Sequence, residues 1–179
     1  KATEWLDNQE VSKKRLAEIE AFLLTLPKVL ADAQAGVAAP AEPEAPVVPA
    51  GGTIAQLEQQ LISLRTQIEA DEKELQSKER EIENRTVRLG DLAKETVDLE
   101  KRMSDAKKQV ASLGTEELAT RVQSIEQQAR ALCLEQQLIT IKAERRRLEE
   151  VAPLLPLQRD LINRTLNTRK KQLTNWQTA

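Results

Sequence analysis

Residues 54–113, written in sevens, read IAQLEQQ LISLRTQ IEADEKE LQSKERE IENRTVR LGDLAKE TVDLEKR MSDAKKQ VASL. The first position of each seven is apolar except at Thr96, and its apolar members are Ile54, Leu61, Ile68, Leu75, Ile82, Leu89, Met103 and Val110. A seven-residue repeat held for about eight heptads is typical of a long helix wound against another helix. The stretch therefore predicts an all-α fold, an elongated antiparallel hairpin or coiled-coil bundle of three to four helices.

The fourth position of each seven is apolar at both ends of this stretch and polar in its middle. It holds Leu57 and Leu64, then Asp71, Lys78 and Arg85, and then Leu92, Leu99, Ala106 and Leu113. Polar residues in a seam usually mark the end of a partner helix or fix the register, and a recognition site is the alternative. We expect a seam that is narrow in its middle.

The partner helix is predicted to follow directly. Thr53 and Gln56 fit a capping box that starts the long helix, and Gly114 before Thr115 predicts a tight turn. The region 53–179 is then a hairpin of 53–113 against 115–178, with a kink or restart at Pro153–Pro156. Its second arm carries one apolar stripe followed by a second in a shifted phase, which would let it face two neighbours in succession; the first stripe is Leu118, Val122, Ile125, Ala129 and Leu132, and the second is Leu134, Leu138, Ile141 and Leu148. Alanine at Leu61 or Leu132 should cost roughly 2–4 kcal/mol if these leucines are buried.

An amphipathic helix is predicted upstream, over residues 1–35. Its apolar positions are spaced by three and four, and Pro27 is expected to kink it or to divide it in two. Residues 36–52, GVAAPAEPEAPVVPAGG, form a Pro/Ala/Gly linker. At about 3.1 Å per residue this linker permits either a parallel or an antiparallel return of the first helix.

Composition excludes several classes of function. The 27 basic and 29 acidic residues nearly cancel, so no sustained field gathers nucleic acid. Uninterrupted apolar runs are shorter than the roughly 18 residues that cross a bilayer, so we expect the segment to be soluble. The chain starts with Lys1, and we interpret it as an excised segment of a longer protein.

Catalytic, cofactor-binding and metal-binding residues are predicted to be absent. The chain has no histidine and a single cysteine, which removes zinc sites and imidazole-based triads. Gly51-Gly52 lacks the lysine of a phosphate-binding loop. The acids occur at helical surface spacings beside bases, as in Glu69–Lys73 and Glu74–Lys78, which favours solvated i,i+4 pairs over acid–base chemistry. We therefore do not expect an enzyme.

Several further features are expected to be structural. The basic residues 145–147 and 169–171 could suggest binding of phosphate, anionic lipid or nucleic acid. We prefer a solvated helix surface, because these groups lack interleaved aromatics and acids neutralise the first of them. Cys133 is expected to be a small helical residue and not a redox switch. Trp5 and Trp176 are expected to pack on a neighbouring helix or on sequence outside this segment, although docking aromatics are the alternative.

The order of parts suggests a family. The stretches IAQLEQQLISLRTQIEADEKEL, LCLEQQLITIKAERRRLEE and LLPLQRDLINRTLNTRKKQLTNWQ, preceded by AEIEAFLLTLPKVLADAQ, resemble the N-terminal coiled-coil "porin" domain of large MscS-type mechanosensitive channels of the KefA/MscK kind. The resemblance covers about Leu16 to Trp176. It implies a periplasmic segment of an inner-membrane protein involved in osmotic protection, which does not itself conduct ions. Neighbouring subunits or cell-wall components would be its partners.

Two other functions remain open at this stage. A periplasmic adaptor of an efflux or secretion assembly would display the tip of the hairpin near Leu113–Glu117. A cytosolic coiled-coil scaffold would self-associate into a defined dimer. The parent reading frame separates these cases, because only the channel requires several membrane spans after Ala179.

Overall fold

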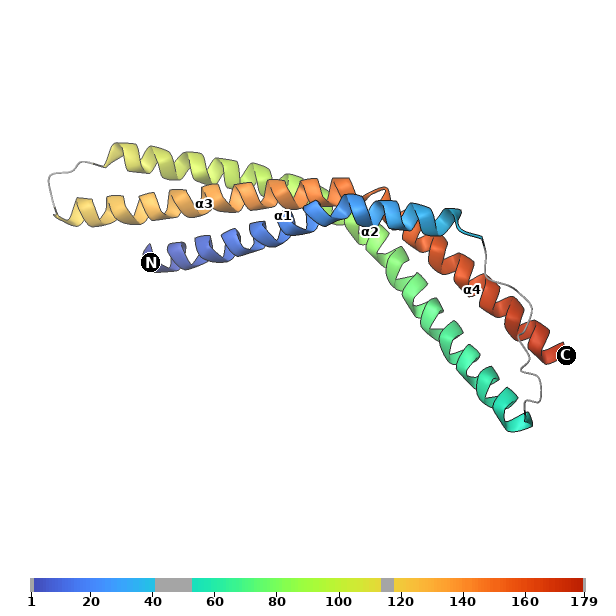
Figure 1. Cartoon of the computed structure of the whole chain (residues 1–179). Coiled ribbons are helices and arrows are strands. Elements are labelled where there is room, and N and C mark those ends of the chain that lie inside the picture. Colours follow the sequence, from blue (N-terminus) through green and yellow to red (C-terminus); the bar gives the residue numbers. More distant parts are fainter. Residues whose placement is uncertain (1, 41–52, 114–117, 179) are drawn as a thin grey trace. The chain divides into compact units, whose positions relative to one another are not determined.

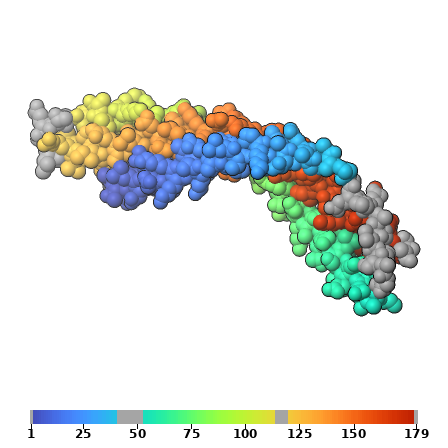
Figure 2. Space-filling view, viewed as in Figure 1, coloured from blue at the N-terminus to red at the C-terminus, as the bar shows by residue number. Residues whose placement is uncertain are grey.

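The computed structural model describes residues 2–40, 53–113 and 118–178. These ranges hold four helices and no strand: α1 (Ala2–Ala38), α2 (Ile54–Ser112), α3 (Leu118–Val151) and α4 (Leu154–Thr178). Figure 1 shows the helices as ribbons and Figure 2 shows them as space-filling atoms from the same side, both in sequence colours. The predicted all-α helical bundle is confirmed.

The helices form two compact units. The first unit contains Lys1–Pro27 and Arg85–Val151, and the second contains Lys28–Asn84 and Ala152–Ala179. Therefore α1 and α2 each contribute to both units, whereas α3 belongs to the first and α4 to the second. Each unit is described by itself below.

In the first unit α3 runs antiparallel to α2 and parallel to α1. Contacts between α2 and α3 join residues whose numbers change in opposite directions, from Arg88 with Glu144 to Lys107 with Glu135. Contacts between α1 and α3 rise together, from Trp5 with Arg130 to Phe22 with Arg147 (Figure 1). The direction of the first helix, which the linker left open, is thus parallel to α3.

The first unit has one small cluster of buried apolar residues as its core. It lies between α2 and α3, and its members are Leu99, Ala106, Ala131, Leu134 and Leu138, with Met103 and Ile141 packed against them. Leu92 and Leu134 are fully buried. Burial of each such leucine contributes about 1.5–3 kcal/mol, so a few positions supply most of the apolar stabilisation.

The second unit joins the last part of α1, the first half of α2 and α4. Ile68, Leu154, Leu155 and Leu166 are buried in it. Gly36 packs closely on α4: a Cβ atom there would lie 3.2 Å from Leu161 Cδ2. A larger residue at Gly36 would therefore require Leu161 to shift.

The first apolar stripe predicted for the second arm does not face a neighbouring helix. Val122, Ile125 and Leu132 are 60%, 59% and 50% exposed, and only Ala129 of the described members is buried. The burial on which the expected cost of alanine depended is therefore not met at Leu132, and Leu61 is only half-buried. The second stripe does face a helix, because Leu134 and Leu138 pack against α2. Ala131 lies in the same core, so α3 already faces α2 before the point where the change of phase was expected.

Helix boundaries follow the sequence signals in part. Thr53 N–H donates to Gln56 Oε1 over 2.9 Å and Gln56 N–H to Thr53 Oγ1 over 3.4 Å, which confirms the capping box. The predicted restart occurs, since α3 ends at Val151 and α4 begins at Leu154.

Pro27 lies inside α1 and does not divide it into two helices. That helix also continues to Ala38, past the predicted start of the linker. The remainder of the linker from residue 41 and the turn at Gly114 lie outside the described residues.

One described helix, α1, is long and apolar enough to cross a membrane by length and composition. Its most apolar stretch is not an uninterrupted apolar run, because it includes Lys28 and Asp32. The sequence expectation, which considered uninterrupted runs alone, therefore did not identify this helix. Ile19, Leu26 and Ala33 of this helix are buried. Core helices of soluble proteins and signal sequences share this length and composition, so this property alone does not assign α1 to a membrane.

Candidate functional site

The polar centre of the first unit is a cluster of Arg15, Arg88, Glu95 and Glu144, here called the Glu144 cluster. Arg15 Nη2 of α1 donates to Glu144 Oε2 over 2.7 Å, and Arg88 Nε of α2 donates to Glu144 Oε1 over 2.9 Å. Arg88 Nη1 also donates to Glu95 Oε1 over 2.6 Å. One carboxylate of α3 therefore joins all three helices.

The hydrogen bonds of this cluster act on a carboxylate that is largely out of solvent. The Glu144 side chain is largely buried, while Arg15 is more than half exposed. Hydrogen bonds to Glu144 and then to Glu95 raise the pKa of Arg88, and burial opposes them only in part. Charge-assisted bonds of this kind hold a partly buried carboxylate in a fixed geometry. The cluster fixes the positions of α1 and α2 on α3.

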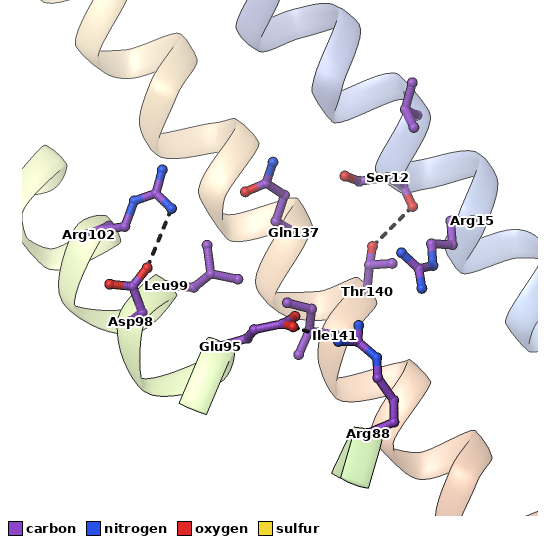
Figure 3. A pocket seen from close by; sticks show the side chains of 11 residues that line it. Ser12, Arg15, Arg88, Glu95, Asp98, Leu99, Arg102, Gln137, Thr140 and Ile141 are labelled. Atoms are coloured by element: carbon purple, nitrogen blue, oxygen red, sulfur yellow. Dashed lines mark hydrogen bonds and ion pairs between the residues drawn. The ribbon is translucent and has the colours of Figure 1, made fainter. Parts of the chain in front are cut away.

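A cavity of about 340 Å³ lies beside the cluster, between α1 and α2 and over α3 (Figure 3). It is lined by Val11, Ser12 and Arg15 from α1, by Arg88, Glu95, Asp98, Leu99 and Arg102 from α2, and by Gln137, Thr140 and Ile141 from α3. In Figure 3 the Arg102–Asp98 pair and the Arg88–Glu95 pair lie at separate places along α2, with Gln137 and Thr140 between the helices. The lining carries three arginines, Arg15, Arg88 and Arg102, against the two acids Glu95 and Asp98.

The hydroxyl of Thr140 is already engaged in helix packing. Its Oγ1 lies 3.0 Å from Ser12 O on α1 and 2.9 Å from Gln136 O on its own helix. Both neighbours are carbonyl acceptors, so the hydroxyl donates to one of them at a time. Because no side-chain base contacts it in the part of the chain that the structure describes, the geometry gives it a structural role.

The polar residues of the seam each find a partner. Asp71 accepts from Arg169 Nη1 over 2.6 Å, and Arg85 Nε donates to the carbonyl of Leu148 over 2.6 Å. Lys78 pairs with Glu81 at 2.7 Å and not with Glu74, so that predicted pair is wrong. The expected pair of Glu69 with Lys73 also does not form in the described ranges.

The basic groups are neutralised or packed. Arg145 and Arg146 pair with Glu149 and Glu150 one turn away, and the Arg147 guanidinium lies 4.6 Å from the centre of the Phe22 ring. Further along, Arg169 binds Asp71, and Lys170 binds Glu72 at 2.7 Å. These contacts agree with the structural role expected for residues 145–147, because Arg145 and Arg146 pair within α3 and Arg147 packs on α1.

Cys133 and the two tryptophans lie within the bundle. Cys133 is a fully buried free thiol whose pKa is raised by burial, with Arg102 opposing the shift. Trp5 lies under the Arg130 guanidinium at 5.8 Å, and Trp176 is half-buried on α4. The positions of Cys133 and Trp5 fit the packing roles expected from the sequence.

The most distinctive surface of the first unit is an apolar stripe on α3, here called the outer stripe: Val122, Ile125, Ala129, Leu132 and Ile139. All of its members except Ala129 are about half exposed or more. Spacings of three, four, three and seven are those of the core positions of a heptad. The large side chains of the outer stripe therefore remain exposed at heptad spacing, whereas Ala129 between them is buried.

Sequence reasoning missed the Glu144 cluster and misassigned the outer stripe. Arg15, Arg88 and Glu144 occur on separate helices among many similar charges, so their meeting depends on tertiary packing. A signal for a second neighbour was nevertheless present: Cys133, Gln137, Thr140 and Glu144 repeat by three and four beside the apolar positions that face α2.

A scan against protein-family models and searches of curated proteins and of solved structures returned no match for this chain.

Proposed function

We propose that this chain is a non-catalytic helical interaction module, and that it forms a periplasmic part of a large MscS-type mechanosensitive channel that acts in osmotic protection. The observation that carries the interaction role is the outer stripe of α3, whose large apolar side chains remain in water at heptad spacing. Exposed apolar patches of this kind mark sites of protein contact.

The channel assignment is supported by the order of parts along the chain. A helix that contains Leu26-Pro27 precedes the Pro/Ala/Gly linker, and long helices follow. In this proposal the module has a structural or regulatory role, and its partners are neighbouring subunits or components of the cell wall. The pore belongs to other parts of the parent protein.

The test starts from the parent reading frame and ends with the full-length protein. A hydropathy scan should find several membrane spans after Ala179. Residues 1–179 are then deleted from the parent, and tension-driven currents are recorded in excised patches beside survival of hypo-osmotic shock. We expect the pore to conduct in the deletion variant, with a changed tension threshold or a changed survival.

A parent without membrane spans would overturn the channel assignment and favour an adaptor, if β-strands flank the helices, or a scaffold, if they do not. An unchanged threshold together with unchanged survival would overturn the structural or regulatory role. The matched control is the full-length parent with Leu24→Ala, because Leu24 is 84% exposed and lies away from the outer stripe.

A further inference from the structure

The first part of α1, residues 2–18, is here called the strap, and it buries little apolar surface. No residue of the strap is buried, and its large apolar side chains at Leu6 and Val11 are half exposed or more. The buried positions of α1 begin at Ile19 and continue with Leu26. Segments with few buried apolar contacts open at a lower free-energy cost than a core does. The strap can therefore leave α3 while the part of α1 from Ile19 onward stays packed.

A packing gap lies under the strap. The cavity of about 340 Å³ is lined by Val11, Ser12 and Arg15 of the strap and by residues of α2 and α3. Figure 3 shows Ser12 and Thr140 joined by their hydrogen bond, with Arg15 beside them. Side chains that line a gap lack contacts on that side, so the strap gains less dispersion energy from α3 than a close-packed helix would. Polar contacts therefore supply a larger share of its attachment.

Two of the contacts that attach the strap depend on charge. Arg15 Nη2 donates to Glu144 Oε2 over 2.7 Å, and the Arg130 guanidinium lies 5.8 Å from the centre of the Trp5 ring. The Arg15 side chain is more than half exposed, so dissolved ions reach it. The screening length of salt falls from about 10 Å at 0.1 M to about 3 Å at 1 M. Added salt should therefore weaken the attachment of the strap.

We propose that the strap is a conformational device sensitive to ionic strength, which lies on α3 at low salt and detaches at high salt. The core between α2 and α3 stays folded in both states, because Leu99, Leu134 and Leu138 pack there through apolar contacts that salt does not screen. The inference goes beyond the proposed function and does not depend on it. Detachment uncovers the face of α3 that carries Thr140 and Glu144.

Cys133 reports whether the strap is in place. Its thiol is free and fully buried, and it lies one heptad before Thr140, on the face of α3 toward the strap. A maleimide therefore reaches this thiol when the strap is detached or when the unit unfolds. N-ethylmaleimide is the probe, because it carries no charge and salt does not change its attraction to the protein.

The experiment measures the rate at which N-ethylmaleimide modifies Cys133 in the whole chain at constant pH. We expect the rate to rise severalfold between about 0.05 M and about 1 M sodium chloride. Arg15→Gln should raise the rate at low salt about twofold to fivefold and should reduce its dependence on salt. The matched control is Arg145→Gln, which removes the same charge from a pair with Glu149 that lies within α3.

Hydrogen exchange followed by mass spectrometry separates detachment of the strap from unfolding. In the unmodified protein the amides of the strap should exchange faster than those of α1 after Ile19 and those around Leu134, and added salt should speed the exchange of the strap alone. Circular dichroism checks that both variants are folded. A thiol rate that is independent of salt, equal effects of Arg15→Gln and Arg145→Gln, or exchange of the strap and the core at the same rate would each overturn the proposal.

Discussion

At the scale of single residues, Leu132 and Leu134 are two positions apart on α3 and differ from half exposed to fully buried. Composition and hydropathy treat them alike, and the spacing of three and four places both in an apolar stripe. They differ in their position relative to α2, because Leu134 faces α2 and Leu132 does not. The sequence therefore shows which faces of a helix are apolar, but it does not show which of these faces another helix covers.

Leu134→Ala should lower the free energy of unfolding by about 2–5 kcal/mol, because it opens a cavity in a fully buried position. Leu24→Ala, at a largely exposed position of α1, should change it by less than about 0.5 kcal/mol. Urea denaturation of both variants measures the difference. Equal effects would contradict the assignment of Leu134 to the core.

Glu144→Gln should destabilise the protein by about 1–3 kcal/mol, because it weakens charge-assisted bonds from Arg15 and Arg88 in a largely buried place. Glu149→Gln is the comparison, since the pair of Glu149 with Arg145 is exposed and should be worth less than about 0.5 kcal/mol. The same denaturation assay applies. If Glu149→Gln costs as much as Glu144→Gln, the Glu144 cluster does not join the helices energetically.

At the scale of helices, the two prolines at positions 27 and 156 have different local surroundings. Pro27 lies in the interior of α1, where it removes a hydrogen bond and crowds the preceding turn. Pro156 is in the first turn of α4, where backbone N–H groups lack helical partners in any case. The sequence predicted a kink or break near each of these prolines. The helix breaks before Pro156, whereas α1 continues through Pro27, because packing on both sides of Pro27 outweighs the local cost.

Pro27→Ala should stabilise the protein by about 1–3 kcal/mol, the gain of a helical hydrogen bond less the greater freedom of the unfolded chain. Pro156→Ala should be neutral or slightly destabilising, by less than about 1 kcal/mol, because only the second effect operates there. Thermal unfolding followed by circular dichroism compares the signs. A loss of stability in Pro27→Ala would mean that α1 needs the proline for its packing.

At the scale of the whole molecule, heptads, capping and proline signals were enough to predict an all-α bundle. The division into two units was not predictable, because it depends on contacts among segments far apart in the chain. The direction of α1 relative to α3 was undetermined for a physical reason: the linker is long enough for both directions. The contacts of α1 with α3, among them those of Trp5 and Phe22, decide between them.

The stability of the whole chain should fall at alkaline pH in a way that depends on Cys133. Burial raises the pKa of this thiol above its ordinary value of 9.0, so the unfolded chain loses the proton first as the pH rises. Above that value the folded state binds more protons than the unfolded state, and the free energy of unfolding declines by up to about 1.4 kcal/mol per pH unit.

Cys133→Ala isolates this effect from the lysines that titrate nearby. The difference in unfolding free energy between the two proteins should be constant below about pH 8 and should shrink as the pH rises further. Urea denaturation at a series of pH values measures it. A constant difference up to pH values where lysines titrate would show that the thiol ionises equally in both states.

The continuity of α1 and α2 through both units limits how this gene can change its length. One inserted residue in α2 rotates every following side chain by about 100° relative to those before it, so the part of α2 in one unit would turn away from its neighbours. An insertion of a whole heptad restores the facing side chains. The break between Val151 and Leu154 lies outside any helix, so related chains should gain or lose single residues there and not within α2.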